Sequence, residues 1–353
     1  MKKWISLLLT LCLLLTGCSF EYVPAQNETT APTSAISGNG DVLLVHFLDV
    51  GQADCILIEY GEFYMLIDGG NRDDGQMVVS YLGQQGIDEL DAVICTHAHE
   101  DHVGGLPSVL AVFPTNAIYA PTKTYSSKIF DDFLYYADQQ GQEIIIPPPG
   151  EWIDVGDLEI TFLGPVKSYA ETNDTSIVCR VDFGETSFLF TGDMEVAAEN
   201  DMMDLWGDDF DWEVDVLKVG HHGSNTSTGY RFLYATTPTY GVISVGQDNS
   251  YGHPHDEPMS RLHDAGVTLF RTDKMGTVLA ISDGQEITFT WENQNADPSN
   301  AEAVEMVYIG NKNSKKFHAP SCDNLPAEKN QVEFASYQDA VDAGYTPCSS
   351  CLG

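Results

Sequence analysis

Short, β-rich apolar runs separated by turn residues dominate the chain from residue 42 onward. Runs of this length and composition are typical of strands, and they predict strands at 42–47, 54–59, 63–67, 92–95, 117–119, 159–163, 176–183, 187–191, 214–219 and 240–245. Helical spacing of apolar positions predicts helices at 76–85, 106–113, 128–140, 196–205 and 257–265. The alternation predicts an α/β protein in which helices flank sheets and functional residues follow strand ends.

The first residues have the pattern of an export signal. Lys2 and Lys3 precede an apolar run, and Leu-Thr-Gly-Cys18 resembles a bacterial lipobox. We therefore expect residues 1–17 to be a lipoprotein signal peptide, with lipid attached at Cys18 on the extracellular face of a membrane. A plain secretory signal or an uncleaved anchor is the alternative.

Composition divides the rest of the chain. Segments rich in Thr, Ser, Pro, Asn and Ala cannot support a packed core, and two of them bracket a long apolar-patterned region. The expected parts are a flexible tether at 18–40, a large domain at 41–292, a linker at 293–304 and a small module at 305–353.

The chain is strongly acidic, with a formal net charge of -37. This charge repels polyanions and argues against tight, nonspecific binding of nucleic acid, although bound divalent cations reverse the sign locally. Cys55, Cys95 and Cys179 stand singly in apolar segments and are expected to be buried thiols.

The most informative stretch follows the predicted strand at 92–95. It places three imidazoles and a carboxylate within six residues, at His97, His99, Asp101 and His102. We expect the first two to face one metal ion and the last two to face another. Such ligands suit zinc, and also manganese or iron. Gly104 and Gly105 are expected to let the backbone turn tightly into a following helix.

This stretch resembles the HxHxDH signature of the metallo-β-lactamase superfamily. Further segments strengthen the resemblance in the right order, namely Asp68-Gly-Gly, Thr-Gly-Asp193, Gly-His221-His222-Gly and Tyr-Gly-His253-Pro. Together they resemble the extracellular hydrolase domain of ComEC-type competence proteins. The resemblance implies an αββα sandwich that holds two divalent metal ions.

The resemblance also implies ligand roles. Asp193 would bridge both metal ions, because its two oxygens can each hold one cation of a pair about 3.5–4 Å apart. One histidine of the His221-His222 pair would complete the second site, and His222 is preferred. Asp68 would orient a metal-bound histidine, although a turn aspartate before two glycines is the plainer interpretation.

Three residues are catalytic candidates on the same basis: Asp101, His221 and His253. His221 would contact a phosphoryl oxygen or move a proton, and His253 would lie at the rim of the substrate site. Superfamily members often carry a further histidine ligand where this chain has Asn173 and Ser176. ComEC-type relatives share these two residues, so the first metal is expected to have fewer protein ligands.

The last fifty residues carry a second cluster of possible ligands, His318, Cys322, Cys348 and Cys351. These ligands suit a closed tetrahedral zinc site, which would hold together a module too small for a self-sufficient core. The spacing resembles the Ada-like zinc-binding module. A disulfide between two of the cysteines is the alternative.

The resemblance implies a metal-dependent hydrolase. Two cations can lower the pKa of a shared water from 15.7 toward about 7 and neutralise charge on an anionic substrate, so phosphodiesters, including DNA or a wall polymer, are the expected substrates. Two alternatives remain: a phosphorylcholine or teichoic-acid esterase of the cell wall, and a non-catalytic surface protein that binds DNA or wall polymer.

Overall fold

The computed structural model describes residues 42–298, 307–320, 322, 324–348 and 351–352. The predicted signal peptide, Cys18, the tether and residues 299–304 of the predicted linker lie outside the described residues. Within the described residues, the strands form sheets of eight, seven and four strands. No helix in these ranges combines the length and the apolar character that a membrane crossing requires.

The first sheet is antiparallel at one side and parallel at the other. β1 pairs antiparallel with β2 and β14, whereas β3, β4, β5 and β6 run parallel. In spatial order its strands are β15 (Ile287–Trp291), β14 (Val278–Ser282), β1 (Leu43–Phe47), β2 (Ile56–Tyr60), β3 (Phe63–Ile67), β4 (Leu90–Ile94), β5 (Thr115–Tyr119) and β6 (Ile144–Ile145).

The second sheet has the same division. β7 to β10 are antiparallel neighbours, and β10 to β13 run parallel. In spatial order its strands are β13 (Thr268–Arg271), β12 (Tyr240–Ile243), β11 (Val216–Lys218), β10 (Thr186–Phe190), β9 (Val178–Phe183), β8 (Leu158–Gly164) and β7 (Trp152–Val155). The carboxyl ends of parallel strands meet at one edge of a sheet, where α/β proteins place their sites.

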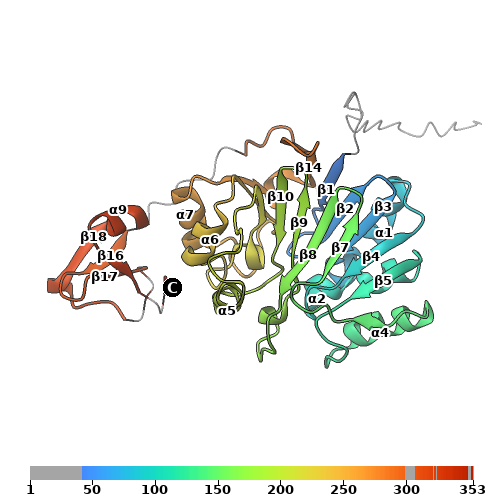
Figure 1. Ribbon diagram of the computed structural model, residues 1–353, viewed down its shortest axis with the longest axis horizontal. Helices are drawn as coiled ribbons and strands as arrows, with labels where there is room; N and C mark the ends of the chain where they lie inside the picture. Colours follow the sequence, from blue (N-terminus) through green and yellow to red (C-terminus); the bar gives the residue numbers. More distant parts are fainter. Residues whose placement is uncertain (1–41, 299–306, 321, 323, 349–350, 353) are drawn as a thin grey trace, which may run out of the picture. The chain divides into compact units, whose positions relative to one another are not determined.

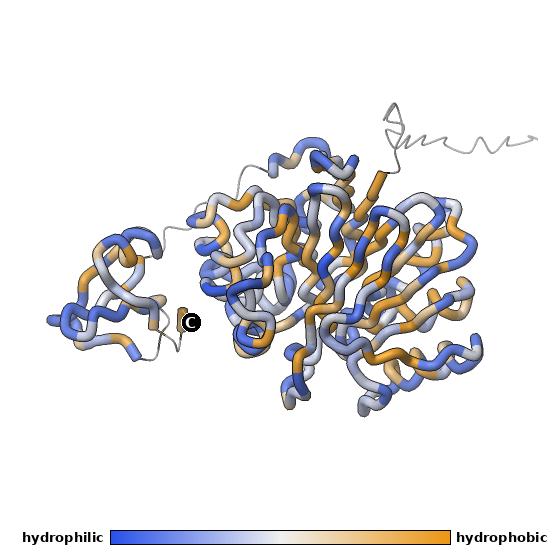
Figure 2. Tube along the Cα trace, viewed as in Figure 1, coloured by the Kyte–Doolittle hydropathy of each residue, from blue (hydrophilic) through white to orange (hydrophobic). Residues whose placement is uncertain are grey.

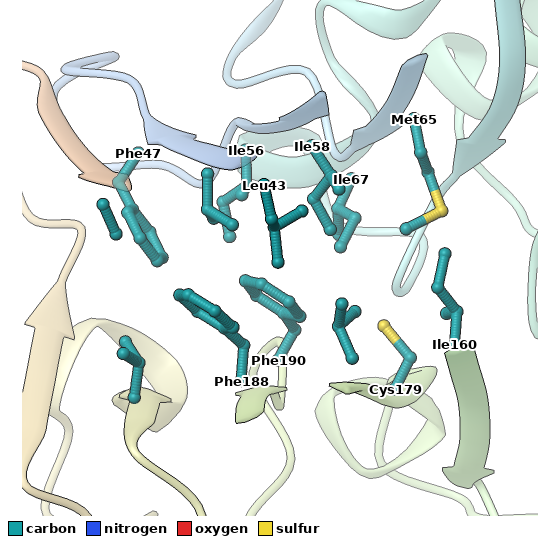
Figure 3. Close-up of a cluster of buried hydrophobic side chains, with 14 of the residues drawn as sticks. Leu43, Phe47, Ile56, Ile58, Met65, Ile67, Ile160, Cys179, Phe188 and Phe190 are labelled. Carbon is teal, nitrogen blue, oxygen red and sulfur yellow. The ribbon is translucent and has the colours of Figure 1, made fainter. Parts of the chain in front are cut away.

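The two sheets pack face to face through a layer of apolar side chains (Figure 3). Phe47 and Ile58 of the first sheet meet Phe188 and Ile160 of the second, and all four are buried. Strands bury one face in this way because their side chains alternate between faces. Hydrophobic residues concentrate in these strands, whereas many turns are hydrophilic (Figure 2).

Helices cover the outer faces of both sheets (Figure 1). The first sheet is covered by α1 (Gly75–Gln84), α3 (Leu106–Leu110) and α4 (Lys128–Gln139), and the second by α5 (Val196–Trp206), α6 (Tyr230–Thr236) and α7 (Asp256–Asp264). The four layers confirm the predicted αββα sandwich. Cys55, Cys95 and Cys179 are buried thiols, as expected.

Several elements were not predicted from the pattern. The strands β13, β14 and β15 and the helix α6 are formed by short runs of four to seven residues. Such runs have weak local preference for one structure. β14 and β15 are fixed by tertiary pairing, because β14 lies between β1 and β15 in the sheet.

The C-terminal module has its own small sheet and core. Its strands lie in the order β18 (Gln331–Phe334), β16 (Tyr308–Asn311), β17 (Lys316–His318) and β19 (Thr346–Pro347), with α9 (Tyr337–Asp342). Tyr308, Phe317, Ala340 and Leu352 are buried in its core. So few large apolar residues give a small domain little stability without a staple.

We expect Phe188→Ala to destabilise the large domain by about 3–5 kcal/mol, because it opens a cavity between the sheets. Val112→Ala, at a side chain that is 55% exposed, should change stability by no more than about 0.5 kcal/mol. Tryptophan fluorescence during denaturant unfolding reports this domain, because the module contains no tryptophan. Equal unfolding midpoints for the two variants would contradict the packing described above.

Candidate metal centre

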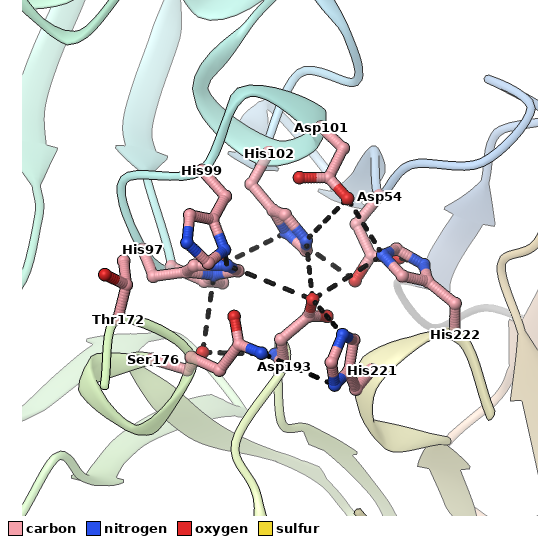
Figure 4. Close-up of polar contacts among 12 residues, drawn as sticks. Asp54, His97, His99, Asp101, His102, Thr172, Ser176, Asp193, His221 and His222 are labelled. Carbon is pink, nitrogen blue, oxygen red and sulfur yellow. Dashed lines mark hydrogen bonds and ion pairs between the residues drawn. The ribbon is translucent and has the colours of Figure 1, made fainter. Parts of the chain in front are cut away.

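The predicted ligands come from loops at the carboxyl ends of strands in both sheets. His97 and His99 follow β4, and Asp101 and His102 lie on α2 (Glu100–Val103) directly after them. Asp193 follows β10 in the second sheet, and the His221-His222 pair follows β11 in a short 3-10 turn, η3 (Gly220–Gly223). The sandwich brings these loops to one place (Figure 4).

Asp193 lies between two groups of imidazoles. Its Oδ2 is 3.3 Å from His102 Nε2 and 3.6 Å from His222 Nε2 on one side. The same atom is 3.9 Å from His97 Nε2 on the other side, and His97 Nε2 is 3.1 Å from His99 Nδ1. Asp193 therefore faces both groups of imidazoles, which is the position that sharing between two metal ions would require.

The group that contains His102 and His222 is the more compact of the two. Asp101, His102, Asp193 and His222 each offer a ligand atom, and these atoms lie within 4.8 Å of one another. Asp101 Oδ2 is 3.4 Å from His222 Nε2. The structure therefore supports His222, rather than His221, as the ligand from the pair.

Several buried atoms in this cavity lack hydrogen-bond partners among the described residues, namely His102 Nε2, His222 Nε2 and Asp193 Oδ1. An unsatisfied buried polar atom costs about 1–3 kcal/mol, and a cation held between these atoms removes that cost. Imidazole nitrogens and a carboxylate in one cavity are a zinc-type donor set. The residues therefore fit the metal ions that the sequence predicts.

The electrostatics of the cavity also favour positive charge. Burial acts to lower the pKa of the His222 imidazole, but the carboxylates of Asp193 and Asp54 raise it to about 10. Burial lowers the pKa of His97 well below its usual range, so its ring is neutral, which is the ligating form. The carboxylates that hold a proton on His222 can equally hold a metal cation.

Asp68 fixes the orientation of His102. His102 Nδ1 lies 2.8 Å from Asp68 Oδ2 and donates its proton there, which leaves Nε2 directed at Asp193. Asp68 also accepts hydrogen bonds from the backbone N–H and the hydroxyl of Thr96, each at 2.7 Å. A carboxylate behind a ligating imidazole is the usual partner at metal centres.

A second carboxylate behind the site was not predicted. Asp54 lies before β2, and its Oδ1 is 3.3 Å from His222 Nδ1. Its Oδ2 pairs with Lys218 Nζ at 2.8 Å, and both side chains are buried. Burial opposes ionisation of Asp54, but Lys218 and His222 hold its pKa below the usual range. The hydrogen-bond partner of His222 Nδ1 is the carbonyl oxygen of Ser244 at 2.9 Å, and Asp54 adds a negative charge beside the same nitrogen.

His221 and His253 face an open cleft of about 490 Å³ rather than the buried cavity. The side chain of His221 is 21% exposed, and its Nε2 is 3.6 Å from Asp193 Oδ2. Its Nδ1 is 3.2 Å from the Thr226 hydroxyl. His255 does not line this cleft, and its Nδ1 accepts a hydrogen bond from Asn225 N–H at 3.0 Å.

Gln52 sets the protonation of His253. The Gly246 N–H donates to Gln52 Oε1 at 3.1 Å, so the Gln52 amide nitrogen faces His253 Nδ1, 3.3 Å away, and donates to it. Burial, reinforced by the charges of His221 and His255, lowers the pKa of His253 to about 4. At neutral pH His253 is therefore neutral and carries its proton on Nε2.

Asn173 and Ser176 occupy the place of the missing histidine. The Ser176 hydroxyl is 3.4 Å from His97 Nδ1 and accepts a hydrogen bond from Asp193 N–H at 3.1 Å. Asn173 donates to Glu195 at 3.1 Å and lines the cleft. Ser176 thus contacts the candidate ligands His97 and Asp193. Neither Asn173 nor Ser176 offers an imidazole to the metal site of His97 and His99.

The two histidines of the pair have strained backbones. His221 and His222 have φ of 48° and 53°, in the left-handed region that non-glycine residues rarely adopt. Such residues cost about 1–3 kcal/mol each and are concentrated at functional sites. This backbone conformation directs the His221 side chain to the cleft and the His222 side chain to the buried cavity.

Gly104 and Gly105 have a different role from the expected tight turn. Both have negative φ values near the helical region. A Cβ on Gly105 would lie 2.0 Å from the carbonyl oxygen of Gly69, and one on Gly104 would lie 2.4 Å from Arg72 N. The glycines are required because this loop packs directly on the backbone of the Asp68 loop.

The C-terminal ligands also come together. His318, Cys322, Cys348 and Cys351 offer one atom each, all within 4.8 Å of one another. No disulfide joins any of the six cysteines of the described residues. One imidazole and three cysteine sulfurs are a donor set that fits a structural zinc ion.

Residues 48–247 match the family model described as "Metallo-beta-lactamase superfamily", and residues 293–352 match "Metal binding domain of Ada". The chain therefore belongs to the metallo-β-lactamase superfamily and has its metallo-hydrolase fold. A second domain of a metal-binding family follows in the same chain.

Two relatives are similar to this chain in sequence. The chain is 32% identical over 262 residues to ComE operon protein 3 of Bacillus subtilis, across 69% of this chain and 33% of that protein. It is 32% identical over 232 residues to competence protein ComA of Neisseria gonorrhoeae, across 65% and 31%. The chain thus spans about a third of the length of these relatives.

The metallo-beta-lactamase fold protein YhfI of Bacillus subtilis is similar with a TM-score of 0.44 and 15% identity. The similarity covers 71% of this chain and 100% of that one.

We expect Asp54→Asn to weaken zinc binding at the His222 site by about 10- to 100-fold, because the ring loses its charged partner. Competition with a chelating dye measures the affinity. Asp49→Asn, at an exposed aspartate in the same loop, is the matched control. Unchanged zinc affinity in Asp54→Asn would show that the charge of Asp54 does not support the ligand.

We expect Cys351→Ser to lower zinc content by one ion per chain and to make the module more sensitive to proteolysis, because the module loses its staple. Elemental analysis and limited proteolysis measure the two effects. Cys179→Ala, at a buried thiol of the large domain, should leave zinc content unchanged. A disulfide-linked module would instead keep its metal content in both variants.

Proposed function

We propose that the large domain is a metal-dependent phosphodiesterase that acts outside the cell, with the chain held at a membrane through a lipid on Cys18. The observation that carries the proposal is the buried cavity in which Asp193 lies between two groups of imidazoles beside an open cleft. The similarity to competence protein ComA supports a nucleic-acid phosphodiester as the substrate that we propose.

Bound divalent cations supply a nucleophile from water at neutral pH and neutralise charge that grows on the phosphoryl oxygens. The chain's own residues position the substrate. His253 Nε2–H can donate to a phosphoryl oxygen, because Gln52 occupies its Nδ1. His221 is partly exposed and oriented by Thr226 and Glu195, so it can donate to a second oxygen or to the leaving group.

Asp101 has a position distinct from that of the buried ligands. Its side chain is 29% exposed, and its Oδ2 faces His222 Nε2 at 3.4 Å. A carboxylate at the boundary of cavity and cleft can both ligate a cation and accept a proton from the attacking water. We therefore assign Asp101 to both roles.

The cell-wall alternative rests on the charge of the cleft. The cleft is lined by Glu100 and Asp101, and its lining includes no Lys or Arg among the described residues. This composition tolerates a cationic group such as choline. Hydrolysis of a phosphorylcholine ester in preference to a nucleotide ester would favour this second function.

We expect Asp193→Asn to lower kcat/KM for bis(p-nitrophenyl) phosphate by at least about 10²-fold, because the carboxylate shared by both groups of ligands is lost. Chelation should abolish turnover reversibly. Asp49→Asn serves as the control. The proposal is wrong if the wild-type protein, with both active-site metals measured, hydrolyses no phosphodiester.

A further inference from the structure

Tyr251 is an exposed aromatic residue at the rim of the cleft. Its side chain is 67% exposed, although it lines the same cleft as His221 and His253. One face of its ring lies against His253, with centroids 5.7 Å apart and planes 24° apart. His253 in turn lies 6.3 Å from the His222 ring at 26°. Near-parallel rings therefore lead from the cleft rim to the metal cavity.

The loop that carries Tyr251 is held in place by Asn249. The Asn249 amide nitrogen donates to the carbonyls of Gly246 and His253 at 2.9 and 2.6 Å. Its Oδ1 accepts hydrogen bonds from the backbone N–H groups of Tyr251 and His253 at 3.2 and 3.0 Å. Because the loop is already held in place, a ligand that contacts Tyr251 pays little conformational entropy for ordering it.

The charge of the cleft limits how a substrate can bind. With carboxylates and no Lys or Arg in the described lining, the cleft cannot grip an anionic backbone by ion pairs. Bound cations would attract the phosphate that is cleaved, but no other phosphate of the substrate. Stacking of a base on an aromatic ring is the interaction that remains, and it does not depend on net charge.

We propose that the outer face of Tyr251 is a stacking surface for a nucleobase attached to the scissile phosphodiester. The inference rests on the proposed function and narrows its substrate to single-stranded nucleic acid or nucleotide esters, because both faces of a base inside a duplex are covered. Tyr251 is a specificity residue, since it contacts the base and not the reacting atoms.

The test compares two esters that release the same chromophore, thymidine 5′-(p-nitrophenyl) phosphate and methyl p-nitrophenyl phosphate. In Tyr251→Ala, kcat/KM for the thymidine ester should fall roughly 5- to 100-fold more than for the methyl ester. Tyr251→Phe should retain the wild-type ratio. Tyr135→Ala removes a tyrosine of similar exposure, 56%, outside the cleft lining and should change neither value.

Three outcomes would overturn the stacking surface: equal loss for both esters in Tyr251→Ala, no loss for either, or a selective loss for p-nitrophenyl phosphorylcholine, which would indicate a cation–π site. If the wild-type protein cleaves neither ester, the proposed function fails separately. Calorimetric titration with thymidine 5′-phosphate then decides, because equal affinity for the wild-type protein and Tyr251→Ala overturns the stacking surface without any turnover.

Discussion

The contact between His102 and Asp193 joins the two sheets at the site. His102 belongs to a loop of the first sheet and Asp193 to a loop of the second, and their atoms approach to 3.3 Å. This approach depends on the dry apolar layer beneath it, which sets the spacing of the sheets. Asp68 then fixes the His102 side chain from behind, and Ser176 holds the backbone N–H of Asp193. The rest of the centre is arranged around this contact.

Much of the fold and most of the ligands could be predicted because their signals are local. His97, His99, Asp101 and His102 fall within six residues after an apolar strand, and Thr-Gly-Asp193 ends another. The strand at 63–67 and the helix α4 coincide with their predicted ranges to within one residue. Strands such as β14 could not be predicted, because pairing with distant partners decides them.

Apart from Asp68, the supporting residues could not be predicted for a related reason. Lys218 is a lone cation in an apolar strand, which in sequence indicates an exposed position, yet it is buried against Asp54 from the first sheet. The Gly104-Gly105 pair suggests a turn in sequence and serves close backbone packing in the structure. Neither role follows from local pattern, since both require knowledge of what lies opposite.

Neither half of the chain holds a complete set of ligands for the centre, because Asp193 and His222 come from the second sheet and His97 to His102 from the first. Metal uptake and docking of the sheets are therefore thermodynamically coupled. Free ion at 100 times its dissociation constant adds about 2.7 kcal/mol to the folded state. A low concentration of metal around the protein would thus shorten the lifetime of the folded state as well as abolish its metal-dependent activity.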